Sequence, residues 1–217
     1  CSMVSGGLAG LFEKRTVPFV NARSALACVV QMLKTKNLWR PSYFCPSMLS
    51  GLQPLDMSIN FYEVDYDLKI VSTGWIDDLQ EADLVIFIDY FGFPAERRMM
   101  KAVKDTGAFV LDDACQALLT PLDDRFADFT LYSPRKFLGV PDGGILVFNT
   151  ESVCETFDLS SPPGDWLVKA VEATVMRRVY DQTAGGDKTW HMLFKQVEEE
   201  MPVGLYRMSD LSCQILK

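Results

Sequence analysis

The pattern of hydrophobic and polar residues predicts a helix near the start of the chain. Apolar residues fall on one helical face at Leu26, Val29, Val30 and Leu33. Asn21 stands where the side chain of an N-cap residue would bind the first turn. The preceding twenty residues are mixed and contain several glycines, and they give no clear prediction.

Short apolar runs further along predict β-strands separated by helical segments. One run, residues 83–90, is hydrophobic almost throughout, which is typical of a strand buried on both faces. One helical segment ends near Gly51, and another covers residues 95–106 and stops at Gly107. The predicted strands are residues 42–45, 60–64, 83–90, 108–111, 129–132 and 144–148.

The character of the chain changes at residues 160–164, Ser-Ser-Pro-Pro-Gly. Beyond them the pattern is helical. The expected helices are residues 165–183, residues 189–200 and a third that Ser209 caps. We therefore divide the chain into a large α/β domain, residues 1–160, and a helical extension of the same domain, residues 161–217.

Strands that alternate with helices over residues 21–150 predict an α/β fold with a mostly parallel sheet. In such sheets, ligands bind at the carboxyl ends of the strands. Asp112 and Asp113 stand at the end of one predicted strand, and residues 133–136 follow another. The sequence therefore places its candidate chemistry at one edge of the sheet.

Composition and charge exclude some classes of function. A net charge of −8 argues against nucleic acid or an anionic membrane as the main partner. No apolar stretch approaches the roughly 20 residues needed to cross a bilayer. Six scattered cysteines without framework spacing, and the lack of a signal-peptide pattern, favour a reducing cytoplasm. No histidines, cysteines or carboxylates have metal-site spacing, so we expect no metal.

Two segments are candidates for binding an anion and a cation. Ala22-Arg23-Ser24 opens the first helix, where free backbone N–H groups and the helix dipole favour an anion, although an ordinary cap is the alternative. A carboxylate that leaves a buried strand, as Asp113 does, needs a cation or a strong donor. The pyridinium N–H of pyridoxal phosphate (PLP) is such a donor, and a turn or capping aspartate is the alternative.

The third segment, Ser133-Pro134-Arg135-Lys136, contains a candidate nucleophile. A free lysine titrates near pH ~10.4, and burial beside other cations lowers its pKa and lets it condense with an aldehyde. Ser133 can donate to a phosphate, and Gly143-Gly144 lets the backbone pass close to a ligand or turn sharply. A surface loop with ordinary basic residues is the alternative.

The order of these segments resembles fold-type I PLP enzymes and, more narrowly, the DegT/DnrJ/StrS family of sugar aminotransferases. The matching stretches are ARSAL, PSYFCPSMLSGLQPLDMSINFYEVD, DYFGFP, VLDDACQALL, ADFTLYSPRKFLGVPDGGILVF and, more weakly, YRMSDL. The resemblance covers roughly residues 20–150, with an echo at 204–214. It implies a three-layer α/β/α fold, the PLP-transferase fold-type I large domain, followed by C-terminal helices.

Carried over by position, the resemblance implies PLP as the cofactor and a role for each matching residue. Lys136 would hold PLP as a Schiff base and later move protons on the substrate carbon. Asp113 would hold the pyridine nitrogen, and Gln116 would contact the ring or its 3-oxygen. Tyr43 or Phe44 would set an aromatic ring against the cofactor. The implied phosphate ligands are Ala22, Arg23, Ser24 and Ser133.

The sequence departs from the family at three points. Ser133 stands three residues before Lys136, whereas common members have a longer interval. Leu205 stands where the family has an asparagine that reaches the partner subunit's cofactor phosphate. Family members continue through a smaller C-terminal domain, which we expect this chain to lack.

The resemblance implies an aminotransferase that moves an amino group from a donor such as glutamate to a keto-sugar. A nucleotide-linked sugar of surface-polysaccharide or antibiotic biosynthesis is the expected acceptor. Lys136 stands where the dehydratase branch of the family has histidine. A fold-type I enzyme on amino acids, such as a cysteine desulfurase, and a non-catalytic protein on this fold are the alternatives. Fold-type I sites lie between subunits, so the resemblance also implies a homodimer.

Overall fold

The computed structural model describes residues 15–53, 55–150, 157–183 and 188–216. Within these residues, seven strands form one sheet in the order β1-β7-β6-β5-β4-β2-β3. The strands are β1 (Thr16–Phe19), β2 (Asn37–Pro41), β3 (Ser58–Tyr62), β4 (Leu84–Ile88), β5 (Phe109–Asp113), β6 (Phe129–Tyr132) and β7 (Gly144–Phe148). Strands β3, β2, β4, β5 and β6 are parallel, while β7 runs antiparallel to β6 and to β1. The prediction of a mostly parallel sheet is confirmed.

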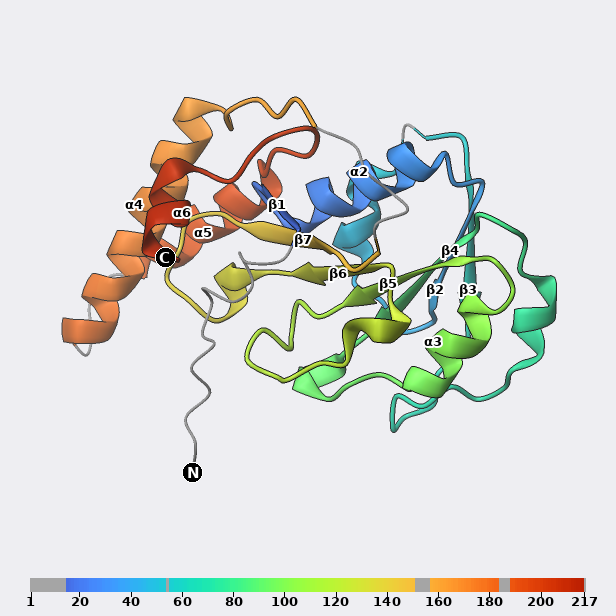
Figure 1. Cartoon of the computed structure of the whole chain (residues 1–217). Coiled ribbons are helices and arrows are strands. Elements are labelled where there is room, and N and C mark those ends of the chain that lie inside the picture. The colour runs from blue at the N-terminus through green and yellow to red at the C-terminus, as the bar shows by residue number, and fades with distance from the viewer. Residues whose placement is uncertain (1–14, 54, 151–156, 184–187, 217) are drawn as a thin grey trace.

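Helices cover both faces of this sheet (Figure 1). The α-helices are α2 (Ala22–Leu33), α3 (Arg97–Lys104), α4 (Gly164–Thr183), α5 (Thr189–Glu199) and α6 (Asp210–Ile215). The 3-10 helices are η1 (Pro46–Gly51), η2 (Gly74–Asp78), η3 (Tyr90–Gly92), η4 (Asp124–Phe126) and η5 (Pro134–Lys136). Helix α2 lies on one side of the sheet and α3 on the other, which gives three layers.

The central strand β4 shows why its sequence is almost continuously apolar. Ile86 and Ile88 pack into the cluster beneath α2, whereas Val85 and Phe87 pack into the cluster beneath α3. Successive side chains of a strand point to opposite faces, so both sets must be hydrophobic when helices cover both faces. The predicted strand over residues 83–90 is confirmed, with its bounds at Leu84 and Ile88.

Three predictions about the outer strands were wrong or incomplete. The second strand of the chain lies at Asn37–Pro41, and residues 42–45 form the loop that follows it. The predicted strand at residues 60–64 begins and ends two residues earlier, as β3. Strand β1 was not predicted, because Pro18 interrupts a run of only four residues. Asp112 and Asp113 lie within β5 rather than beyond it.

The C-terminal helices pack against the sheet's β1 edge. Trp166 of α4 and Val197 of α5 share a buried cluster with Val20, which follows β1. The backbone N–H of Val20 donates to Tyr206 (2.9 Å), and that of Met208 donates to Pro18 (3.0 Å). Ser209 caps α6 by accepting from the N–H of Ser212, as predicted.

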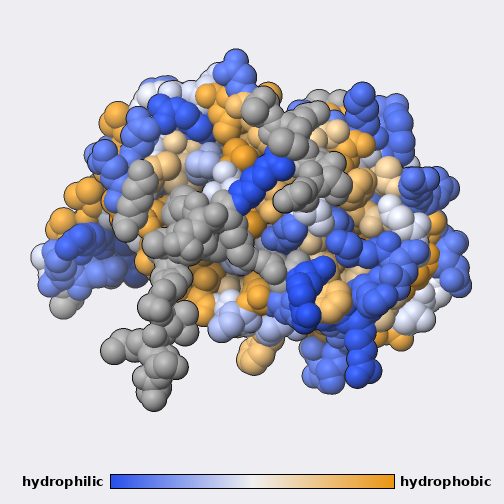
Figure 2. Space-filling model, in the orientation of Figure 1, coloured by the Kyte–Doolittle hydropathy of each residue, from blue (hydrophilic) through white to orange (hydrophobic). Residues whose placement is uncertain are grey.

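The surface combines charged and hydrophobic areas. Figure 2 shows hydrophobic residues at the left of the molecule, over α4, where Val168, Val175 and Val179 are more than half exposed. None of the helices in the described residues is long and apolar enough to span a membrane.

Candidate active site

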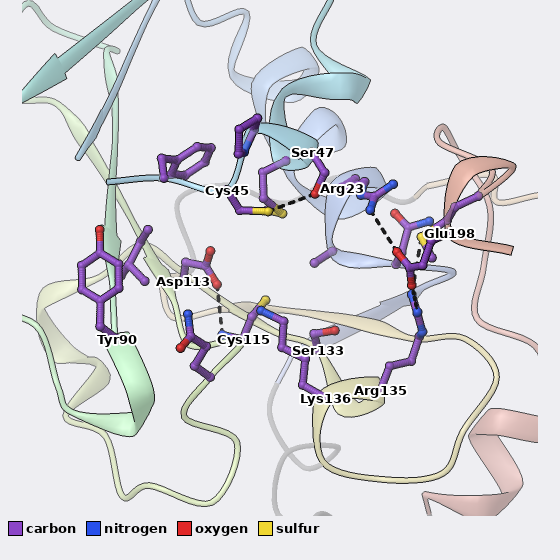
Figure 3. Close-up of a pocket in the computed structure, with 18 of the residues that line it drawn as sticks. Arg23, Cys45, Ser47, Tyr90, Asp113, Cys115, Ser133, Arg135, Lys136 and Glu198 are labelled. Carbon is purple, nitrogen blue, oxygen red and sulfur yellow. Dashed lines mark hydrogen bonds and ion pairs between the residues drawn. The ribbon is translucent and has the colours of Figure 1, made fainter. Parts of the chain in front are cut away.

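A pocket of about 650 Å³ opens at the carboxyl ends of the parallel strands (Figure 3). Its walls come from the start of α2, the loop after β2, the ends of β4, β5 and β6, and helix α5. The volume lies in the range of pockets that hold a small-molecule ligand, roughly 300–1,000 Å³. The predicted position of the chemistry, at this edge of the sheet, agrees with the structure.

Seven of the eight residues that the sequence nominated line this pocket. They are Ala22, Arg23, Tyr43, Asp113, Gln116, Ser133 and Lys136. Phe44, the alternative to Tyr43, lines it too. Ser24 is not among the lining residues: it is fully buried, and its hydroxyl oxygen accepts from the backbone N–H of Gly204 at 3.2 Å. The structure therefore does not place the Ser24 side chain in the pocket, and a phosphate contact of Ser24 stays a prediction.

Asp113 ends β5 with its carboxylate directed into the pocket (Figure 3). The residue is 7% exposed, and its Oδ1 accepts from the N–H of Cys115 at 3.0 Å. Lys136 extends into the same space from η5. Burial and then the Asp113 charge raise the pKa of the Cys115 thiol, while the Lys136 charge lowers it, so both charged groups act on one buried atom.

Lys136 itself is exposed, and Ser133, three residues earlier, is 8% exposed. The single chain therefore does not enclose Lys136. Lys136 lies four residues after the end of β6 at Tyr132, in the short helix η5. This short path from a fixed strand positions the amine at the pocket's edge.

The start of α2 forms the wall opposite η5. Asn21 caps the helix by accepting from the N–H of Ser24 at 2.9 Å, as predicted. A Cβ atom at Gly144 would collide with the backbone of Asn21 and Ala22, so only glycine allows β7 to begin there. Gly143 has a φ of +141° and donates its N–H to Val20 at 2.7 Å. The glycine pair thus holds the first turn of α2 against the sheet.

A buried cluster of charges lies behind Asp113, on the opposite side of β5. Asp112 accepts from Arg97 at 2.6 Å, and Arg97 also contacts Asp89 at 3.4 Å. Burial, followed by the charge of Asp89, raises the pKa of Asp112 to about 7. One oxygen of Asp112, Oδ1, has no hydrogen-bond partner. Arg97 therefore forms ion pairs with two buried carboxylates.

Several pocket residues were not predicted. Tyr90 donates its hydroxyl to the carbonyl of Tyr43, and the two rings lie 5.7 Å apart. Tyr90 follows the apolar β4 run, at the edge of the sheet where ligands bind, and this position could have indicated Tyr90 as a pocket residue. Glu198 of α5 accepts from Arg23 at 3.2 Å and also from Arg135. No local pattern connects Glu198 with residues so distant in sequence.

The donor set of the pocket suits an organic anion rather than a metal. Among the described residues, no three histidines, cysteines or carboxylates are grouped so that they could hold a metal ion. The pocket instead combines two acids, one primary amine, two arginines and the N-terminus of a helix. They come from Asp113, Glu198, Lys136, Arg23, Arg135 and α2.

Comparison with known proteins shows the fold. No protein-family model matches the chain, and no curated protein does. Among solved structures, the chain is similar to Spr1654 from Streptococcus pneumoniae, described as a sugar aminotransferase in its PLP form, with a TM-score of 0.56 and 15% identity. The match covers 68% of this chain and 45% of that one.

Two further structures have the same fold. The sugar aminotransferase CalS13 from Micromonospora echinospora matches at a TM-score of 0.56 and 13% identity, over 67% of this chain and 47% of that one. The E. coli GDP-4-keto-6-deoxy-D-mannose-3-dehydratase with hydrated PLP matches at a TM-score of 0.54 and 15% identity, over 67% of this chain and 42% of that one. The chain thus spans less than half the length of these proteins. At such identities the likeness shows the fold, which is the fold that the sequence motifs implied.

Proposed function

We propose that the chain is the cofactor-binding part of a PLP-dependent aminotransferase. The observation that carries the proposal is the placement of Asp113 and Lys136 in one pocket that also contains the start of α2. These groups suit the three ends of PLP, namely its ring nitrogen, its aldehyde and its phosphate. If Asp113 and Lys136 lay on different faces of the molecule, one PLP molecule could not contact both.

Each residue has a defined role in this proposal. Asp113, which is almost buried, holds a proton on the ring nitrogen, because a nearby carboxylate stabilises the protonated form. Lys136 provides the amine that attaches the cofactor and moves a proton at the reacting carbon. Ser133 and the backbone N–H groups of Ala22 and Arg23 bind the phosphate. When bound, PLP supplies an electron sink for the substrate's α-carbon.

The acceptor that we propose is a keto-sugar, nucleotide-linked, with an amino acid such as glutamate as donor. The similarity to structures described as sugar aminotransferases supports this class of substrate. Lys136 favours amino transfer over dehydration, because the dehydratase branch has histidine at the matching position. The volume of about 650 Å³ accommodates the cofactor together with part of a sugar.

We also propose that the active protein is a cytoplasmic homodimer. Near the pocket, Tyr43, Phe91 and Phe93 are 60%, 69% and 75% exposed, and grouped exposed aromatic residues are typical of protein interfaces. A second subunit over them would also cover the exposed Lys136. Cys45 and Cys115 are free thiols, which agrees with a reducing compartment.

Covalent attachment of PLP tests the proposal most directly. Purified protein is mixed with PLP, reduced with borohydride and digested, and the modified lysine is identified by mass spectrometry. We expect the label on Lys136 and the loss of the cofactor's visible absorbance band in Lys136→Ala. Lys101→Ala is the control, because Lys101 is exposed and pairs with Asp105 on α3. A label on another lysine, or an unchanged band in Lys136→Ala, would reject the proposal.

A further inference from the structure

Two arginines of the pocket meet on one carboxylate of the same chain. Arg23, in the first turn of α2, and Arg135, in η5, both donate to Glu198 of α5 (Figure 3). Their side chains are only 18% and 15% exposed, and that of Glu198 is 35% exposed. Two positive charges therefore face one negative charge in the wall of the pocket.

Hydrogen bonds also attach the segment after Glu198 to the start of α2. Asn21 donates from its side-chain amide to the carbonyl of Pro202 at 2.7 Å, and Ser24 accepts from Gly204 at 3.2 Å. These contacts fix the path of residues 198–204 across the first turn of α2. Pro202 and Gly204, which follow Glu198 by four and six residues, therefore lie against the same helix start as Arg23.

The charge balance favours an anion of higher charge than a carboxylate. A phosphate group carries close to two negative charges at neutral pH and offers three acceptor oxygens, so it satisfies two guanidinium groups better than one carboxylate does. The dipole of α2 adds to the attraction at this position. A partly exposed ion pair such as Arg23–Glu198 contributes little to stability, so its exchange for another anion costs little.

We propose that Arg23 and Arg135 form an anion-binding site in which Glu198 is an internal occupant that a phosphate group displaces. The inference rests on the proposed function where the phosphate is that of the cofactor. A phosphate of a nucleotide-linked substrate has the same chemistry and is the other possible source. In both cases, Glu198 lowers the apparent affinity of the pocket for phosphate, because only the open form of the site can bind it.

The test compares Glu198→Gln with the wild type and with Glu199→Gln. Glu199 is the control, because it is the next residue of α5 and is exposed. Binding of inorganic phosphate, PLP and pyridoxal is measured by titration calorimetry. If Glu198 fills the site about nine-tenths of the time, its neutralisation raises the phosphate affinity about tenfold. We expect this increase in Glu198→Gln and an unchanged affinity in Glu199→Gln. Equal or weaker phosphate binding by Glu198→Gln would overturn the proposal.

The arms with PLP and pyridoxal distinguish the source of the phosphate. A gain for PLP without a gain for pyridoxal assigns the site to the cofactor's phosphate. A gain for inorganic phosphate that persists in protein already loaded with PLP assigns it to a second phosphate group. If PLP attaches to neither protein while the gain for inorganic phosphate remains, the proposed function fails and the anion site stands.

A measurement on the wild type avoids dependence on the variant's folding. Hydrogen exchange of residues 189–204 is followed with and without inorganic phosphate. Displacement of Glu198 removes a contact that holds α5 against the pocket, so we expect faster exchange there with phosphate present. Unchanged or slower exchange in this segment would contradict the displacement.

Discussion

Asp112 and Asp113 are neighbours in one strand and have opposite surroundings. Asp113 faces the pocket, where we propose that it meets a cofactor. Asp112 faces the other side of the sheet, where it shares Arg97 with Asp89. Alternation along the strand explains the difference, because consecutive side chains point to opposite faces. The family resemblance singled out Asp113, but the sequence indicated no role for Asp112, since its partner Arg97 lies fifteen residues earlier.

The buried position of Asp112 predicts a dependence of stability on pH. Its pKa is raised to about 7, above the value of ~3.9 in an unfolded chain. Between these pH values the folded protein binds more protons than the unfolded one, so the contribution of Asp112 to stability falls as the pH rises. Asp112→Asn lacks this titration. We expect its free energy of unfolding, relative to the wild type, to increase from pH ~4 to pH ~7 and then to stay constant.

Urea unfolding of both proteins at several pH values measures this difference. Asp105→Asn, at an exposed aspartate that pairs with Lys101, is the control. A difference between Asp112→Asn and the wild type that does not change with pH would show that Asp112 is ionised in the folded protein at all these pH values.

At the scale of elements, strands buried along their whole length were predictable, whereas strands with few buried residues were missed or shifted. Strand β4 is hydrophobic throughout because clusters of side chains cover both its faces. In β2, only Leu38 and Pro41 are buried, and its polar residues hide the strand pattern. The aromatic residues Tyr43 and Phe44 resemble a strand in sequence, yet they belong to the lip of the pocket.

Helix α6 depends on a buried carboxylate from the loop before β7. Asp142 is fully buried and accepts from the N–H of Ser209 at 2.7 Å, from its hydroxyl at 2.6 Å and from the hydroxyl of Ser212. Hydrogen bonds to a charged group contribute about 1.5–3 kcal/mol each, and a buried donor that loses its partner is costly. We expect Asp142→Asn to lower the free energy of unfolding by about 3 kcal/mol.

Thermal or urea unfolding measures this loss, with Asp210→Asn as the control. Asp210 lies in the same helix, and its side chain is 78% exposed in an ion pair with Arg207, so its substitution should cost less than about 1 kcal/mol. Equal effects of the two substitutions would mean that Asp142 is not the residue that anchors α6.

At the scale of the whole molecule, the helical segment after residue 160 joins the sheet rather than standing apart. Trp166 and Val197 pack against Val20, and residues 206–208 pair with the β1 region. The sequence indicated helices here but not this attachment, because the contacts join residues more than 140 positions apart. We propose that residues 161–217 extend the same domain, as the sequence suggested.

A single domain predicts a single unfolding transition. Far-UV circular dichroism reports mainly on helices, and α4 is the longest in the described residues, whereas labelling of the buried Cys115, just after β5, reports on the sheet. We expect both signals to change at the same urea concentration. Two separate midpoints would show that the helical segment unfolds independently of the sheet.

The distance in sequence between the arginines and Glu198 has a consequence for synthesis of the protein. Arg23 and Arg135 leave the ribosome before Glu198, which follows Arg135 by 63 residues. At about 5–20 residues per second, this interval lasts roughly 3–13 seconds. During that time the growing chain has both arginines without their internal counterion. An anion that reaches them then does not compete with Glu198.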